Sequence, residues 1–219
     1  MQQFQGILFD LDGVLIDSEP IHNLKWVEAL SEYKIRVDQS WLNKFIGVQD
    51  KLIAQEIVET FELPVTSERL LEEKRWKYRQ YICSELAPFP ELTVAIKSLQ
   101  KYKLGIVTSS EKAEVDLITQ KMGINSLFDI IVRGDEIINN KPCPDIYLKA
   151  IKMLGVVSSQ CIAIEDSFVG VQSAKSAGLF VIAITNSLFY SEMIKAADYI
   201  CENTLSAISY IKSLNLNYG

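Results

Sequence analysis

Two aspartates separated by one residue follow a short apolar run near the N-terminus. The run covers residues 6–9, and Asp10 and Asp12 come directly after it, with Gly13 next in the chain. Residues two apart in an extended segment point to the same side, so the two carboxylates would flank one small volume. Different surroundings can separate their pKa values, so that one carboxylate attacks a substrate and the other transfers a proton. Asp10 and Asp12 are therefore candidate catalytic residues, with a pair of surface acids in a turn as the alternative.

Other residues suited to chemistry follow later apolar runs or lie in the long loop of residues 134–144. They are Thr108, Ser109, Lys141, Glu165 and Asp166. Carboxylate oxygens are ligands that Mg²⁺ prefers, whereas a hydroxyl, backbone amides and a lysine suit the oxygens of a phosphate group. Each residue has an ordinary alternative: a strand-end threonine, a solvated loop lysine, and an acidic pair that caps the next helix. Their joint occurrence at successive strand ends favours a site for a divalent cation and a phosphate.

The elements that must position these residues alternate along most of the chain. Apolar runs typical of parallel strands buried on both faces occur at residues 6–10, 104–108, 129–132, 161–165 and 180–184. Helical patterns lie between the later runs, at residues 91–100, 111–122, 144–154 and 168–177. This alternation predicts an α/β fold with a doubly wound, Rossmann-like parallel sheet. Ligands of such sheets bind beyond the carboxyl ends of the strands, which is where the candidate residues are expected.

Residues 18–86 interrupt this alternation. They contain helical patterns without a convincing strand, at residues 20–33, 39–45, 51–61 and 67–86. A helical block after the first strand of an α/β sheet predicts an inserted helical cap subdomain. We therefore expect an α/β core formed by residues 1–17 and 87–219, and a cap formed by residues 18–86.

Composition excludes several classes of protein. Hydrophobic residues make up 48% of the 219 residues, which is enough to bury a core and excludes disorder. The net charge is −6, and the chain has no block of lysine and arginine, so neither nucleic acid nor an anionic membrane surface is an expected partner. No window approaches 18 uninterrupted apolar residues, and the first residues lack the pattern of a signal peptide.

Cysteine and histidine usage argues against a zinc site. The four cysteines, Cys83, Cys143, Cys161 and Cys201, form no CxxC pair, and the chain has one histidine. We expect four reduced thiols in a cytoplasmic protein. Core packing explains the aromatic residues of the helical block as well as an exposed apolar face does, so a monomer is the expected state.

Four segments resemble the four motifs of the haloacid dehalogenase superfamily. They occur in the family's order and read FDLDGVLIDSEP (residues 9–20), IVTSS (106–110), KPCPD (141–145) and IEDSFVGVQSAKSAG (164–178). The resemblance covers essentially the whole chain, including a helical cap after the first motif, which is similar to that of the β-phosphoglucomutase and phosphoglycolate-phosphatase-like subfamily. Asp12 argues against dehalogenase activity, because dehalogenases of the superfamily lack the second aspartate of the first motif.

The resemblance implies a role for each matching residue of the catalytic motifs. Asp10 would attack phosphorus and form an aspartyl-phosphate. Asp12 would protonate the leaving oxygen and then activate water, while its backbone carbonyl would bind Mg²⁺. Thr108 and Lys141 match the second and third motifs.

The same resemblance implies residues that bind the metal and the phosphate. Asp10, Asp12 and Asp166 would be metal ligands, and Glu165 would be a further ligand, directly or through water. Ser109 and Lys112 would line the phosphate pocket.

In the cap, His22 matches a histidine that contacts substrate in the phosphoglucomutase group, and Lys77 matches a cap lysine of that group. A histidine used for packing or exposed at the surface is the alternative for His22. The mutase pattern also has an arginine that holds a second phosphate, where this chain has Gln49 and then Asp50. An acid at that position would repel a second phosphate and favour transfer to water, although Lys51, Lys74 or Arg75 would be a substitute cation.

The sequence therefore predicts an Mg²⁺-dependent phosphatase that hydrolyses a small phosphomonoester, either a sugar phosphate or a nucleoside monophosphate, through an aspartyl-phosphate. The alternative is a sugar phosphomutase of the β-phosphoglucomutase type. A signalling receiver domain also combines an acidic cluster, a threonine and a lysine around a phosphorylated aspartate. It has that aspartate after a middle strand and no helical insert, so it explains this chain poorly.

Overall fold

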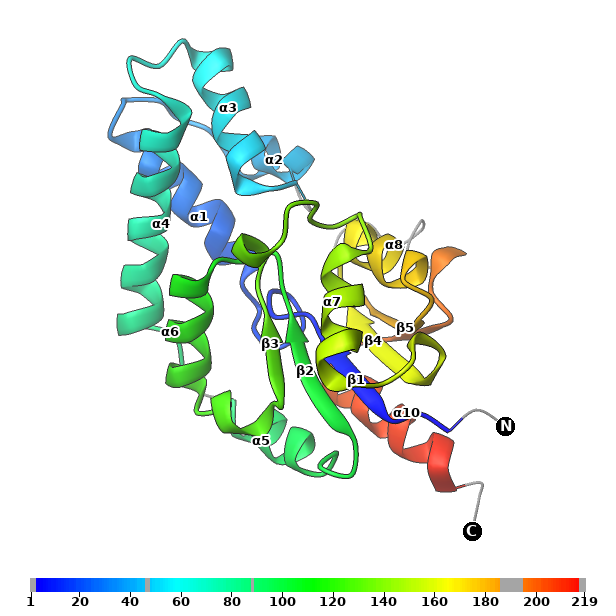
Figure 1. Cartoon of the computed structure of the whole chain (residues 1–219). Coiled ribbons are helices and arrows are strands. Elements are labelled where there is room, and N and C mark those ends of the chain that lie inside the picture. The colour runs from blue at the N-terminus through cyan, green and yellow to red at the C-terminus, as the bar shows by residue number, and fades with distance from the viewer. Residues whose placement is uncertain (1–2, 46–47, 88, 186–194, 217–219) are drawn as a thin grey trace. The chain divides into compact units, whose positions relative to one another are not determined.

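The structure is a computed structural model that describes residues 3–45, 48–87, 89–185 and 195–216 (Figure 1). The chain divides into two compact units, each of which is described by itself. The first unit consists of residues 1–16 and 87–219, and the second of residues 17–86.

Within its described residues, the first unit contains a six-stranded sheet in which all neighbouring strands are parallel. The spatial order is β3-β2-β1-β4-β5-β6. The strands are β1 (Gly6–Phe9), β2 (Lys103–Val107), β3 (Ile130–Val132), β4 (Cys161–Glu165), β5 (Phe180–Ile184) and β6 (Tyr199–Cys201). Every residue of β1 and of β4 is buried, as their continuous apolar runs predict. The predicted α/β fold with a doubly wound parallel sheet is confirmed.

Helices cover both faces of this sheet. On one face, α7 (Asp145–Leu154) packs on β2 and β3, and α8 (Phe168–Ser176) packs on β4 and β5. Figure 1 shows α7 in front of the sheet and α10 (Thr204–Leu216) behind it. The described residues of this unit also form α5 (Pro90–Lys97), which contacts α10, and α6 (Lys112–Met122). Among the described helices, none combines the length and apolar character needed to cross a membrane.

The strand order reverses direction beside β1, and the site lies at this reversal, at the carboxyl ends of the central strands. The chain runs from β1 outward through β2 and β3, and then returns to place β4 on the other side of β1. Phe9 is in register with Ile106 of β2 and Ile164 of β4. The residues that follow these three strand positions therefore lie at one level, at the carboxyl end of the sheet, where α/β proteins bind ligands.

The second unit is helical in its described residues. Its helices are α1 (Glu19–Ser31), α2 (Gln39–Leu42), α3 (Asp50–Phe61) and α4 (Ser67–Ser84). Helix α4 begins after Thr66, whose hydroxyl accepts a hydrogen bond from the backbone N–H of Arg69, as its position before the helix predicts. The apolar core of this unit includes Trp26, Leu30 and Ile57.

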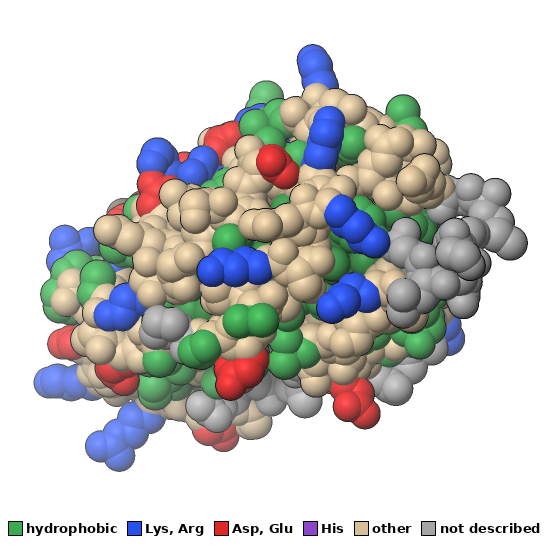
Figure 2. Space-filling model, turned by 90° about the horizontal axis from the view of Figure 1, so that it is seen from below, with side chains coloured by type: hydrophobic (Ala, Val, Ile, Leu, Met, Phe, Trp, Pro, Cys, Tyr) green, Lys and Arg blue, Asp and Glu red, His purple; other side chains and the backbone are tan. Residues whose placement is uncertain are grey.

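The space-filling view in Figure 2, seen from below Figure 1, shows one face of the molecule. Lysine and arginine side chains are dispersed over this face, with acidic and apolar side chains between them. The charges of this face are therefore mixed in sign.

Candidate active site

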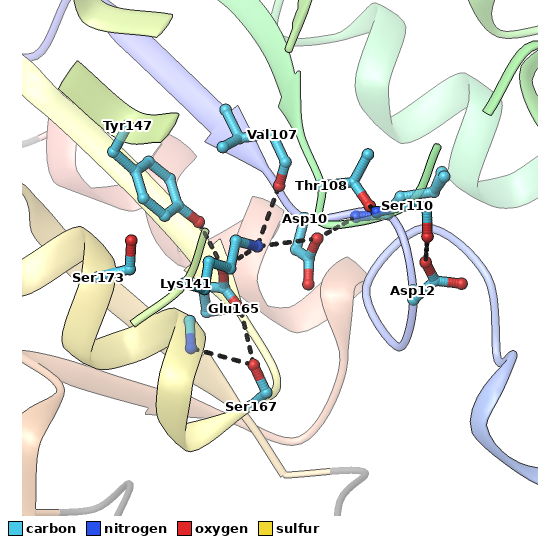
Figure 3. A network of polar contacts seen from close by, with 12 residues as sticks. Asp10, Asp12, Val107, Thr108, Ser110, Lys141, Tyr147, Glu165, Ser167 and Ser173 are labelled. Carbon is cyan, nitrogen blue, oxygen red and sulfur yellow. Dashed lines mark hydrogen bonds and ion pairs between the residues drawn. The ribbon is translucent and has the colours of Figure 1, made fainter. Parts of the chain in front are cut away.

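The first unit brings most of the predicted site residues together beyond the carboxyl ends of its central strands (Figure 3). Asp10 follows β1, Thr108 follows β2, and Glu165 ends β4 with Asp166 next in the chain. All four residues are buried. Lys141, from the loop between β3 and α7, is also buried and points into the same cluster.

The ammonium group of Lys141 lies at the centre of this cluster. Its Nζ donates to the backbone carbonyl of Val107 at 3.1 Å and to Oε1 of Glu165 at 2.6 Å, and it lies 3.1 Å from Oδ1 of Asp10. Three N–H groups are sufficient for these three acceptors. Burial by itself lowers the pKa of Lys141, but the two adjacent carboxylates outweigh burial and raise it above the ordinary value for lysine. Lys141 is therefore protonated at neutral pH and compensates buried negative charge.

Glu165 has no exposed surface and is held through both of its oxygens. Oε1 accepts from Lys141 and from the hydroxyl of Tyr147, the latter at 2.5 Å. Oε2 accepts a longer hydrogen bond, 3.4 Å, from the hydroxyl of Ser167, the residue that caps the N-terminus of α8. Burial and the charges of Glu165 and Asp10 raise the pKa of Tyr147, so its hydroxyl stays protonated and donates a hydrogen bond to Glu165.

Asp10 combines a fixed oxygen with a raised pKa. Oδ1 accepts from the backbone N–H of Leu11 at 2.8 Å and faces Lys141. Burial and the negative charges of Glu165 and Asp12 outweigh the attraction of Lys141, and together they raise the pKa of Asp10 to about 8. The cluster therefore holds more negative charge than Lys141 alone compensates.

Asp12 and Thr108 are connected through Ser110. The hydroxyl of Ser110 donates to Oδ2 of Asp12 at 2.5 Å, and its backbone N–H donates to the hydroxyl of Thr108 at 3.0 Å. Asp12 is less buried than Asp10. The loop after β2 therefore orients the second aspartate of the first motif.

Two glycines lack side chains where the carboxylates of Asp166 and Glu165 lie. Gly13 has a φ of 74°, and a Cβ atom there would lie 1.8 Å from a carboxylate oxygen of Asp166. A Cβ atom on Gly170, in the first turn of α8, would lie 1.9 Å from Oε2 of Glu165. Any larger residue at either position would displace the adjacent carboxylate.

The donor set of this cluster fits a hard divalent cation. Asp10, Glu165 and Asp166 each offer one oxygen, these oxygens lie within 4.8 Å of one another, and all three residues are buried. Oxygen ligands of this kind suit Mg²⁺ or Ca²⁺, and a cation would offset the burial and the repulsion by Glu165 that raise the pKa of Asp10.

The two residues that the resemblance places in the phosphate pocket, Ser109 and Lys112, are more exposed than the cluster around Lys141. Ser109 is exposed. Its backbone lies so close to Gly134 that a Cβ atom on Gly134 would be 2.1 Å from the Ser109 carbonyl oxygen. The side chain of Lys112 is 66% exposed and forms an ion pair with Asp116 in the same helix. The structure brings neither side chain into the buried cluster around Lys141.

The predicted substrate residues of the helical segment lie in the second unit, where His22 contacts Lys74. Nζ of Lys74 lies 2.6 Å from Nδ1 of His22 and 2.6 Å from Oδ2 of Asp50, and Lys74 itself is completely buried. Lys77 instead forms an ion pair with Glu32 at 3.0 Å. The lysine beside His22 is therefore Lys74, and the role of Lys77 in substrate binding stays a prediction.

Two residues of the cluster, Tyr147 and Gly170, were not predicted from the sequence, and Ser110 was expected only as one of three polar residues that follow β2. Tyr147 lies on the apolar stripe of α7, which by itself indicates a core residue. Ser110 is the third polar residue after β2, and nothing in the sequence separates it from its neighbour Ser109. Gly170 lies three residues after Ser167, and its position opposite Glu165 depends on how α8 packs on the sheet.

Known proteins and a known family match this chain over most of its length. The model of the haloacid dehalogenase-like hydrolase family matches residues 7–184. The fructose-1-phosphate phosphatase YqaB of Escherichia coli K12 is 28% identical over 183 residues, which are 84% of this chain and 97% of that protein. A phosphorylated carbohydrates phosphatase of Thermotoga maritima is 30% identical over 179 residues, covering 80% of this chain and 82% of that protein.

Solved structures include the crystal structure of a β-phosphoglucomutase from Clostridium difficile. It matches this chain with a TM-score of 0.79 and 27% identity, and the match covers 99% of each chain. The predicted resemblance is confirmed, and the names of the relatives agree with the prediction of an enzyme that acts on phosphate esters. Because the family model matches well over half of its residues, the chain belongs to the haloacid dehalogenase-like hydrolase family.

Proposed function

We propose that this protein is an Mg²⁺-dependent phosphatase that hydrolyses a small phosphomonoester, a sugar phosphate or a nucleoside monophosphate. The observation that supports this most directly is the convergence of buried carboxylates, Lys141 and Thr108 at the carboxyl ends of β1, β2 and β4. Phosphomonoester hydrolysis depends on positioning and on charge stabilisation, which is what such a cluster offers.

In the proposed reaction, Asp10 is the nucleophile. Oδ1 is engaged with the Leu11 amide and with Lys141, so Oδ2 is the oxygen that attacks phosphorus. The new bond joins Oδ2 to phosphorus while the ester P–O bond breaks, and the leaving oxygen takes a proton from Asp12. In the second half, Asp12 takes a proton from water, the water oxygen bonds to phosphorus, and the bond to Asp10 breaks to release inorganic phosphate.

The remaining residues orient these two aspartates and balance charge. Lys141 keeps Asp10 and Glu165 in place, and the Thr108 hydroxyl and neighbouring backbone amides are suited to the phosphate oxygens. Asp10, Asp166 and the backbone carbonyl of Asp12 would hold Mg²⁺, with Glu165 beside them. A bound Mg²⁺ supplies positive charge to the oxygens of the transferring phosphoryl group.

The cluster of Asp50, Lys74 and His22 supports a phosphatase over a phosphomutase. A mutase must hold a bisphosphate and needs a cation for the second phosphate. In this chain the buried Lys74 is already compensated by Asp50 at 2.6 Å. We assign recognition of the organic part of the substrate to this cluster, with His22 as a contact, and we propose that the hydroxyl groups of a sugar suit it better than a second phosphate.

The similarity to a β-phosphoglucomutase over the whole chain keeps the mutase as the second candidate. The two functions differ in the group that accepts the phosphoryl group: water in the phosphatase, and the sugar phosphate intermediate in the mutase.

Phosphate release distinguishes them. It should be measured with Mg²⁺ and with EDTA across sugar phosphates, nucleoside monophosphates and phosphoglycolate, with a coupled assay for glucose 6-phosphate formed from β-glucose 1-phosphate. We expect Mg²⁺-dependent release of phosphate. Formation of glucose 6-phosphate without net release would establish the mutase instead, and no turnover of any substrate would contradict both.

A further inference from the structure

Tyr147 is a buried residue of the first unit to which the proposed reaction gives no role. It lies on α7 with no exposed surface and packs in the core with Val107, Val132 and Ala150. Its aromatic ring fills apolar volume that a phenylalanine would fill equally well. Packing therefore accounts for the ring but leaves the hydroxyl unexplained.

The hydroxyl points out of the core toward the acidic cluster, as Figure 3 shows. It donates to Oε1 of Glu165 at 2.5 Å, and the same oxygen accepts from Lys141 at 2.6 Å. A carboxylate oxygen has two lone pairs, so these two donors occupy Oε1. Oε2 is then the oxygen through which Glu165 is able to meet a cation or a water bound to one.

The opposite side of the carboxylate is restricted by Gly170 and Ser167. Oε2 lies 1.9 Å from the position that a Cβ atom of Gly170 would take, and it accepts from Ser167 at 3.4 Å, a longer bond than either bond to Oε1. Rotation of the Glu165 carboxylate about the Cγ–Cδ bond is therefore opposed mainly by the two hydrogen bonds to Oε1. Without the Tyr147 hydroxyl, Lys141 alone would hold that oxygen, while Lys141 also serves Asp10 and Val107.

We propose that Tyr147 is a positioning residue of the metal site: its hydroxyl fixes the orientation of Glu165, so that Oε2 is directed to the cation bound among Asp10, Glu165 and Asp166. This inference rests on the proposed Mg²⁺ site. It assigns to Tyr147 a role that acts through Glu165 and involves no contact with substrate.

The test is Tyr147→Phe, which removes the hydroxyl and keeps the ring. The dissociation constant for Mg²⁺ should be measured by calorimetric titration of the substrate-free protein. We expect it to rise at least about tenfold, as is typical when a hydrogen-bond partner of a metal ligand is removed. The Mg²⁺ concentration that gives half-maximal phosphate release should rise by the same factor, and kcat should recover largely at saturating Mg²⁺.

Tyr33→Phe is the matched control. The Tyr33 hydroxyl donates to Glu73 at 2.6 Å in the second unit, so the control also removes a tyrosine–glutamate hydrogen bond, but one outside the acidic cluster. It should leave the Mg²⁺ dissociation constant unchanged.

The outcomes separate this inference from the proposed function. Unchanged Mg²⁺ affinity in Tyr147→Phe, together with Mg²⁺-dependent activity of the wild-type protein, would overturn the role of Tyr147 alone. Thermal unfolding in EDTA shows whether the Tyr147→Phe protein is folded. A Tyr147→Phe protein that does not fold would also overturn the role of Tyr147, because the hydroxyl would then be required for the fold. A wild-type protein that neither binds Mg²⁺ nor releases phosphate would overturn the proposed function, and this inference with it.

Discussion

Among single residues, Asp10 has the largest expected effect on turnover. An amide at this position neither attacks phosphorus nor binds Mg²⁺ well, so Asp10→Asn should lower kcat by at least about a thousandfold. Because burial and nearby negative charges raise the pKa of Asp10, the ionised side chain is unfavourable in the metal-free fold. The variant should therefore unfold in EDTA at a temperature no lower than the wild-type protein does. Near-native phosphate release by Asp10→Asn would contradict the assignment of the nucleophile.

The loss of rate on replacing Asp12 should be larger for a leaving group that must be protonated than for one that departs as an anion. Asp12→Asn cannot supply the proton, and general acid–base catalysis typically contributes about 10²–10⁴-fold. We expect a loss in this range with an alkyl phosphate and a smaller loss in the first half-reaction with p-nitrophenyl phosphate, whose leaving group needs no proton. Burst kinetics with the aryl ester would show this difference, because release of nitrophenol would precede slow hydrolysis of the aspartyl-phosphate. Equal rate losses in both half-reactions for both esters would contradict the role of Asp12 as acid.

Among the elements, α8 has to approach β4 closely, and Gly170 is what permits the approach. Alanine normally favours a helix over glycine by about 1 kcal/mol, so replacing a helical glycine by alanine would usually stabilise the fold. At this position the added Cβ atom would lie 1.9 Å from Glu165, so the sign reverses. Gly170→Ala should destabilise the fold by about 1–3 kcal/mol, the usual range for overpacking. It should also weaken Mg²⁺ binding.

Chemical denaturation and calorimetric titration with Mg²⁺ measure these two effects of Gly170→Ala. Gln172→Ala is the control, because it lies in the same helix at an exposed position and should change neither. A Gly170→Ala protein that is more stable than the wild type and binds Mg²⁺ equally well would show that α8 has room to move away from β4.

The same packing determines how much of the site was predictable from the sequence. Asp10, Thr108 and Glu165 were predictable because apolar runs mark where buried parallel strands end, and those ends meet at one edge of a sheet. Tyr147 was not predictable, since its position on the apolar stripe of α7 is explained completely by core packing. The three-residue edge strand β6 carries too little pattern to be recognised. The contact between Lys74 and His22 was not predictable either, because it depends on how α1 and α4 pack.

For the molecule as a whole, the chemistry and the recognition of substrate are assigned to different units. The first unit holds the acidic cluster, and the second holds a buried lysine with two partners. The proposed function therefore calls for a substrate with one phosphate and a polar, uncharged remainder. Selectivity between a monophosphate and a bisphosphate should therefore depend on charge in the second unit, and should be separable from catalysis.

Asp50→Asn tests this separation. The substitution removes one negative charge but keeps a hydrogen-bond acceptor for Lys74, so the unit should remain folded. Lys74 would then carry uncompensated positive charge, and a sugar bisphosphate should bind about tenfold more tightly as a competitive inhibitor, which corresponds to about 1.4 kcal/mol. The inhibition constant is measured against phosphate release from the best monophosphate, whose kcat should change little. Glu32→Gln, which removes the partner of Lys77, is the control and should leave bisphosphate inhibition unchanged. If Glu32→Gln strengthens inhibition and Asp50→Asn does not, the lysine that senses the substrate is Lys77, as the family motif indicated, and the cluster around Lys74 serves the fold alone.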